Sequence, residues 1–177
     1  MTRLFLTSRT ARSLAVAVLC LAPLAVMPAG CKLFRRTPLQ STVNTRDPRT
    51  AGQLLDGFYG VEAAAWRWSA KQFSVKLKTP AGAAQKGATL KVVLTVPPAV
   101  IEKSTTVTLS ASFGTTTLPP ETYSAPGEYT YRRDVPANLL TGSDVIVNFA
   151  LDKSMKPDGP DRRELGLVIT TVGLETK

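Results

Sequence analysis

The stretch Gln72–Lys78 has the sequence QFSVKLK, in which polar and apolar side chains alternate. Successive side chains of a β-strand point to opposite faces of the sheet, so Phe73, Val75 and Leu77 share one face. This period of two indicates a strand with one face in the core and the other in water. The stretch decides the fold class, because the same pattern recurs along the chain.

Three further runs alternate in the same way. Their apolar members are Leu90, Val92, Leu94 and Val96, then Val107, Leu109, Ala111 and Phe113, then Val145, Val147, Phe149 and Leu151. Turns separate the runs, because proline lacks the N–H that a ladder needs and glycine accepts positive φ. Turns of this composition lie at 79–82, 97–98, 118–120, 125–127 and 156–160.

Helices are expected to be few, about one turn each at 51–56 and 137–140. Regularly spaced strands with Pro- and Gly-containing turns predict an all-β fold, a single antiparallel β-sandwich domain at residues 54–177. The preceding segment, 31–53, mixes basic and turn-forming residues without either periodicity. It is predicted to be a flexible linker that follows Cys31.

The N-terminus has the composition of an export signal. Residues 1–13 carry three arginines and no acidic residue, and residues 14–29 form an uncharged apolar run that ends in small residues. A transmembrane helix needs about 20 apolar residues, whereas this run is shorter and contains Pro23. Residues 1–30 are therefore predicted to be a cleaved signal peptide, with a permanent membrane helix as the alternative.

The end of that run, Pro28-Ala29-Gly30-Cys31, resembles the lipobox of bacterial lipoproteins, apart from Pro28 where leucine is usual. The resemblance implies cleavage before Cys31, acylation (palmitate) of its sulfur and attachment to a membrane of the bacterial cell envelope. Lys32 after the cysteine favours the outer membrane by the same resemblance. The alternative is an ordinary secreted protein with a chance cysteine. An unpaired, unmodified thiol would be unusual in an oxidising compartment.

Two segments resemble a jelly-roll-like β-sandwich module of bacterial glycan-related proteins. The opening segment runs from Gly57 to Glu62 (GFYGVE) and continues with Trp66-Arg67-Trp68-Ser69-Ala70. The closing segment is Asp161–Gly166 (DRRELG), followed by an apolar strand at 167–174. The resemblance implies the fold and a carbohydrate context, and it brings no established activity.

The candidate ligand-binding residues come from these segments and are Glu62, Trp66, Arg67, Trp68, Asp161 and Arg163. Trp66 and Trp68 share a strand face, and this face would make a sugar-stacking platform if it pointed outward. The large apolar area of the two indoles favours an inward orientation, in the core. The charged members could bind a sugar or carboxylate through paired hydrogen bonds, or form a structural salt-bridge network. Tyr123, Tyr129 and Tyr131 could contact a ligand or simply pack.

Composition excludes several chemistries. The chain has no histidine, which rules out triads of the Ser-His-Asp type and metals bound by histidine. Its two cysteines are Cys20, which lies inside the signal, and Cys31. Thiol catalysis and metals bound by cysteine are therefore ruled out as well. A paired-carboxylate glycosidase and calcium binding by Asp152, Asp158 and Asp161 stay possible but lack the usual spacing. The expectation is no enzyme, no cofactor and no metal.

The charge of the mature chain is moderate. Loss of Arg3, Arg9 and Arg12 with the signal reduces 22 basic residues to 19 against 13 acidic ones, which lowers the net charge from +9 to +6. Without a basic block, nucleic acid is not an expected partner. The first hypothesis is a non-catalytic envelope lipoprotein that binds glycan or is structural; the alternative is a protein-interaction subunit of an export or assembly machine.

Overall fold

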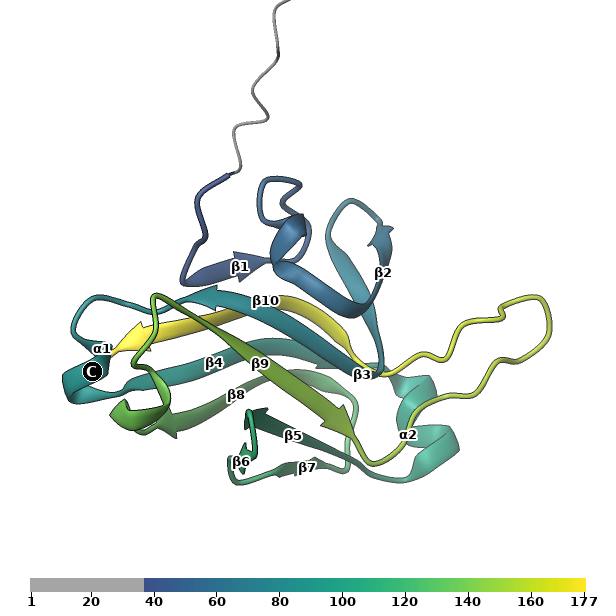
Figure 1. Ribbon diagram of the computed structural model, residues 1–177. Helices are drawn as coiled ribbons and strands as arrows, with labels where there is room; N and C mark the ends of the chain where they lie inside the picture. The colour runs from purple at the N-terminus through teal and green to yellow at the C-terminus, as the bar shows by residue number, and fades with distance from the viewer. Residues whose placement is uncertain (1–36) are drawn as a thin grey trace, which may run out of the picture. The chain divides into compact units, whose positions relative to one another are not determined.

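Antiparallel strands make up most of the computed structural model, which describes residues 37–177 (Figure 1). The strands are β1 (Thr42–Asn44), β2 (Leu54–Glu62), β3 (Trp66–Lys78), β4 (Ala88–Val96), β5 (Val107–Phe113), β6 (Thr116–Thr117), β7 (Glu121–Tyr123), β8 (Gly127–Val135), β9 (Asp144–Leu151) and β10 (Val168–Thr176). Two short helices, α1 (Ala83–Lys86) and α2 (Pro98–Ser104), and two 3-10 turns at Ala51–Gln53 and Ala137–Leu139 connect them.

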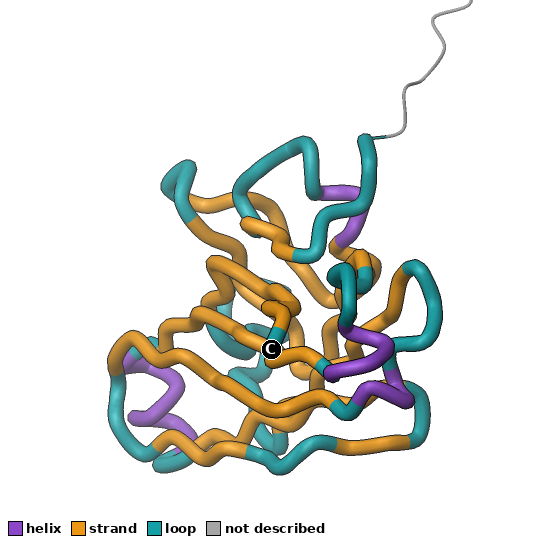
Figure 2. Tube along the Cα trace, turned by 90° about the vertical axis from the view of Figure 1, so that its left-hand side faces the viewer, coloured by secondary structure: helices purple, strands orange, loops and turns teal. Residues whose placement is uncertain are grey.

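The strands hydrogen-bond in the order β6-β5-β9-β3-β10-β4-β8, with β1 beside β10, β2 beside β3 and β7 beside β5. Strand β3 joins the two halves, because it pairs with β10 at Arg67 and Trp68 and then with β9 from Gln72 to Lys78. The sheet curls through β3 so that its halves enclose one core (Figure 2). The predicted all-β antiparallel sandwich is confirmed.

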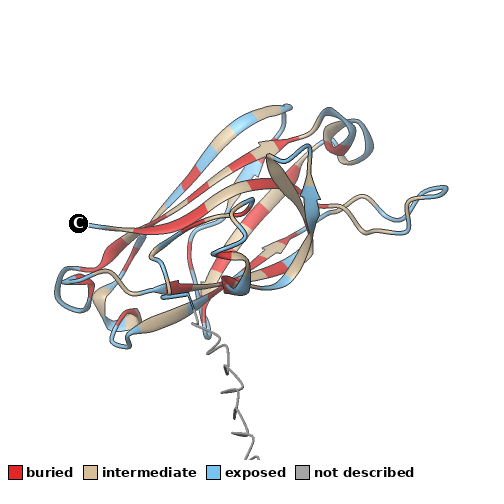
Figure 3. Ribbon diagram, turned by 90° about the horizontal axis from the view of Figure 1, so that it is seen from above, coloured by how far each residue is buried: buried red, intermediate tan, exposed pale blue. Residues whose placement is uncertain are grey.

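Alternation along the strands builds that core. Buried and more exposed residues alternate without exception along β4 and β5. Figure 3 shows buried and more exposed segments side by side along the strands. Phe73, Val75 and Leu77 are at most 2% exposed, and the rings of Phe73 and Phe149 stack with centroids 4.8 Å apart. The four predicted alternating runs are therefore confirmed, as parts of β3, β4, β5 and β9.

The predicted linker is wrong for residues 42–53, and the domain begins before residue 54. Val43 is fully buried, because β1 pairs with β10. The hydroxyl of Thr45 donates to the carbonyl of Ile169 at 2.7 Å, and the Gln53 amide donates to the carbonyl of Lys76 at 2.7 Å. A strand of three residues is too short to show a period, so its long-range pairing left no pattern in the sequence. Cys31 and the predicted signal peptide lie outside the described residues.

The helices agree only partly with expectation. Both predicted helical turns occur as 3-10 turns, although residues 54–56 of the first belong to β2, and the sequence did not predict α1 and α2. The Pro97-Pro98 pair, predicted as a turn, begins α2, because a first-turn position needs no backbone N–H donor and suits proline's fixed φ. Within residues 37–177, no helix has the length and apolar character needed to cross a membrane.

Candidate functional site

The two motif segments, separated by about a hundred residues in the sequence, meet at Ser69. The Ser69 N–H donates to the carbonyl of Leu167 at 2.8 Å, and the Ser69 carbonyl accepts from the N–H of Gly166 at 2.7 Å. The Leu167 N–H also donates to the Ser69 hydroxyl at 3.1 Å. A Cβ at Gly166 would lie 2.6 Å from Leu151 Cδ1 and 2.7 Å from Ser69 Oγ, so the contact requires glycine.

Glu62, Asp161 and Arg163 form one charged network. The Arg163 guanidinium donates to Glu62 Oε1 at 2.6 Å and to both carboxylate oxygens of Asp161, at 3.0 and 2.8 Å. These bonds with Arg163 lower the pKa of Asp161 to about 2 and raise the pKa of Arg163. The Tyr59 ring lies under the guanidinium, with its centroid 5.3 Å away. Arg163 thus has its main partners inside the protein.

Arg67 is not part of this network, although the sequence grouped it there. Its Nε donates to the carbonyl of Thr45 at 2.6 Å and its Nη1 to the carbonyl of Tyr59 at 2.7 Å. Arg67 therefore ties β3 to β2 and to the end of β1. The salt-bridge alternative accounts for the geometry of Glu62, Asp161 and Arg163 but not of Arg67, and ligand binding by the four charged residues stays a prediction.

Trp66 and Trp68 lie at a surface hollow of about 610 Å³. Both are half-buried, and Trp68 also packs against the hydrophobic core, so the full burial that area arguments favoured is not reached. The reason is register: Trp68 is paired laterally with Val168, Val168 with Thr95, and Thr95 with the exposed Glu128. Laterally paired residues share a sheet face, so Trp68 stands on the outer face of β10, β4 and β8.

Both polar and apolar groups line the hollow around the indoles. Glu62 accepts a hydrogen bond from Trp68 Nε1 at 3.2 Å, which fixes the position of this ring. The rest of the lining is Ala65, Thr95, Pro97, Pro98, Glu128, Val168 and Thr170. Of the six predicted ligand-binding residues, the hollow brings together Glu62, Trp66 and Trp68.

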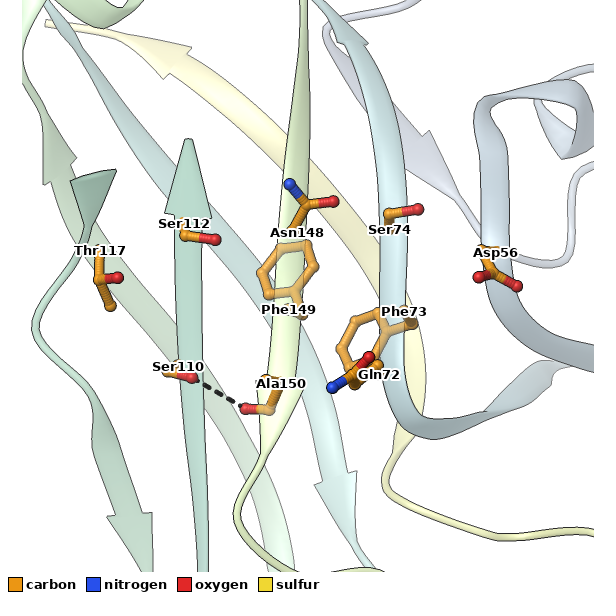
Figure 4. A pocket seen from close by; sticks show the side chains of 10 residues that line it. All are labelled: Asp56, Gln72, Phe73, Ser74, Ser110, Ser112, Thr117, Asn148, Phe149 and Ala150. Atoms are coloured by element: carbon orange, nitrogen blue, oxygen red, sulfur yellow. Dashed lines mark hydrogen bonds between the residues drawn. The ribbon is translucent and has the colours of Figure 1, made fainter. Parts of the chain in front are cut away.

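A second concavity, a groove of about 430 Å³, was not predicted from the sequence. It lies on the outer face of β5, β9 and β3 (Figure 4). Its lining residues are Asp56, Gln72, Phe73, Ser74, Ser110, Ser112, Thr117, Asn148, Phe149 and Ala150. The only sequence signal was the run of small polar residues at the outward positions of these strands, which is also the ordinary pattern of a solvated sheet face.

The tyrosines and aspartates that the sequence also offered as candidates are mostly buried or bonded to other residues of the protein. Tyr123 and Tyr131 are buried, and burial raises the pKa of both phenols. Asp152 accepts from the Thr108 N–H at 2.6 Å, whereas Asp158 pairs with Lys103 at 3.0 Å. The three aspartates proposed for calcium thus have separate partners, and no group of three or more such ligands is gathered in the described part of the chain.

No protein-family model and no curated protein matches the chain. One solved structure that does match is described as "CBM4 structure and function". It is 14% identical to this chain, covers 76% of this chain and 81% of its own, and superimposes with a TM-score of 0.33. At that TM-score the likeness transfers no site or ligand to this chain.

Proposed function

We propose that this protein is a non-catalytic, glycan-binding β-sandwich held at the bacterial cell envelope, at the outer membrane, by a lipid on Cys31. The observation that carries the glycan part is the hollow in which Trp66 and Trp68 stand half-buried beside carboxylates and hydroxyls.

The hollow suits the chemistry of a sugar. A pyranose ring has an apolar C–H face and a rim of hydroxyls. The flat apolar surface of an indole can stack on the C–H face. Glu62 and Glu128 can accept hydrogen bonds from the rim, and Thr95 and Thr170 can both donate and accept. Glu128 makes no side-chain hydrogen bond or ion pair within residues 37–177, so its carboxylate is available.

The position of the Trp68 ring is set before a ligand arrives. Trp68 is held by its bond to Glu62, and Glu62 in turn by Arg163 at 2.6 Å. Pro97 and Pro98 have restricted φ and line the same hollow. A site ordered in advance loses less conformational entropy on binding, which favours affinity.

Titration with envelope polysaccharide fragments, followed by calorimetry, tests the glycan part. Wild-type protein is expected to show saturable binding that weakens about tenfold in Trp66→Ala, because the stacking surface is lost. Trp66→Phe should recover part of the affinity. Ile146→Ala is the matched control, since Ile146 is 44% exposed and does not line the hollow. Equal affinity of wild type and folded Trp66→Ala, or recovery of only a protein partner, would overturn the proposal.

The anchor has an independent test. Cells grown with labelled palmitate should incorporate label into wild type and not into Cys31→Ser, and wild type should fractionate with the outer membrane. The support is the lipobox-like Pro28-Ala29-Gly30-Cys31 at the end of the apolar run. Label in both proteins, or in neither, contradicts lipidation at Cys31 and leaves the glycan proposal standing.

A further inference from the structure

The groove on the outer face of β5, β9 and β3 is built from one row of polar residues that crosses five strands. Strand register places Thr117 beside Ser112, Ser112 beside Asn148, Asn148 beside Ser74, and Ser74 beside Asp56. A second, shorter row runs beside it, from Ser110 through Ala150 to Gln72. Figure 4 shows these side chains on neighbouring strands along the groove.

The row has the length of an extended ligand. Neighbouring strands lie about 4.8 Å apart, so four intervals span roughly 19 Å perpendicular to the strands. Ser112 and Ser74 on either side of Asn148, and Ala150 in the second row, have small side chains, which leave the groove open along this line. Its volume of about 430 Å³ falls within the range of small-ligand sites, about 300–1,000 Å³.

The polar groups of the groove are available to a ligand. The side chains of Gln72, Ser74, Ser112, Thr117 and Asn148 make no hydrogen bond to another residue within the described chain; Ser110 donates to the carbonyl of Ala150 at 3.1 Å. Arg163, by contrast, is already bound to two carboxylates. The groove thus offers hydroxyl and amide groups that both donate and accept hydrogen bonds.

The charge of the groove selects among ligands. Asp56 is its single charged lining residue, although 20% of the whole chain is charged. A groove without cations gives no favourable pairing to a sulfated, phosphorylated or carboxylated chain, and Asp56 repels one. The uncharged hydroxyls of a neutral ligand can form hydrogen bonds with the hydroxyl and amide side chains of the lining.

The floor of the groove is rigid. Phe73 and Phe149, each 2% exposed, stack 4.8 Å apart on the core side of β3 and β9, directly under this surface. Close core packing fixes the two central strands, so the polar row keeps its spacing without a ligand.

We propose that this groove is a second carbohydrate site, which binds an extended segment of an uncharged polysaccharide lying across the strands. The inference rests on the proposed function for its ligand class. Its residues are separate from the tryptophan hollow, because no residue lines both concavities.

The test is a titration of the folded protein with neutral glucan oligosaccharides of increasing length and with their sulfated forms, followed by amide NMR shifts. Longer neutral oligosaccharides should shift amides of β5, β9 and β3. Binding at these amides should be lost in Ser112→Trp, which fills the groove, and be about tenfold weaker in the double variant Gln72→Ala/Asn148→Ala, which loses hydrogen bonds. Trp66→Ala, in the other concavity, should leave the groove shifts unchanged.

The outcomes separate the two sites. Shifts confined to the tryptophan hollow, with groove variants identical to wild type, overturn this inference and leave the proposed function intact. Equal or stronger binding of the sulfated oligosaccharides at the groove overturns its selectivity for uncharged chains. Absence of any shift on both faces overturns the groove and the glycan proposal together. If Ser112→Trp does not fold, the double variant decides, since it only truncates two exposed side chains.

Discussion

Arg163 Nη1 and Glu62 Oε1 lie 2.6 Å apart, although the two residues are separated by 101 positions in the sequence. Glu62 ends β2 and Arg163 belongs to the loop that leads into β10, so the bond joins the opening and closing segments of the domain. Glu62 also accepts from Trp68 Nε1, so the same carboxylate positions a ring of the tryptophan hollow.

Replacement of Arg163 with alanine is expected to lower the free energy of unfolding by about 1 kcal/mol. The pair is charge-assisted, but both side chains are 36% exposed and water screens them. A double-mutant cycle with Glu62→Gln, measured by chemical unfolding, isolates the coupling. Additive effects of the two substitutions would contradict a direct interaction, and Arg162→Ala is the matched neighbour without an ion pair among the described residues.

The pH dependence of stability should contain a component from Asp161. Its pKa is lowered from 3.8 to about 2 by the bonds from Arg163, so the folded state favours the ionised carboxylate. This contribution is fully present above pH 3.8 and is lost as the pH falls toward about 2. The stability difference between wild type and Asp161→Asn should therefore shrink across that window. A carboxyl ¹³C titration of Asp161 with its midpoint at the ordinary value would refute the bonding.

Residues before position 54 should be needed for stability. Val43 is fully buried in β1, so Val43→Ala removes two methyl groups from the core and should cost about 2 kcal/mol in the free energy of unfolding. Thr42→Ala on the same strand changes an exposed side chain and serves as the control. Equal unfolding midpoints for the two variants would restore the linker interpretation.

The four strands that periodicity predicted, β3, β4, β5 and β9, are strands whose burial alternates along the predicted runs. β4 and β5 are buried at every second residue, so period alone located them. Strand β2 shows no such period, because three register shifts interrupt its pairing with β3. One of these shifts lies at Gly57, between Asp56 and Phe58. The backbones approach so closely there that a Cβ at Gly57 would lie 2.0 Å from the carbonyl oxygen of Gln72.

The sites were less accessible to prediction than the strands. Spacing established that Trp66 and Trp68 share a face, but which face depends on the register of Trp68 with Val168. The polar groove depends on pairings such as Ser112 with Asn148, which are contacts between residues far apart in the sequence. A sequence pattern describes one strand at a time, and a row across five strands is a property of the assembled sheet.

The β2–β3 hairpin carries backbone strain beside the tryptophan hollow. Ala63 and Ala64 have φ of 47° and 52°, in the left-handed region that disfavours residues with a Cβ. Ala64→Gly should therefore raise the free energy of unfolding by about 0.5–1 kcal/mol. Ala81→Gly, at an exposed turn position with ordinary φ, should give no gain. Thermal unfolding of both variants tests this, and destabilisation by Ala64→Gly would contradict the left-handed conformation.

Gly166→Ala should destabilise the protein by about 2 kcal/mol, because the added methyl group would overpack a closed contact. Its Cβ would meet Leu151 Cδ1 at 2.6 Å, Ser69 Oγ at 2.7 Å and the carbonyl oxygen of Ala70 at 2.8 Å. Gly60→Ala is the matched control, since nothing lies within 4 Å of a Cβ at Gly60 and its φ is ordinary. Chemical unfolding measures both. If Gly166→Ala were as stable as Gly60→Ala, the close approach of the two motif segments at Ser69 would be refuted.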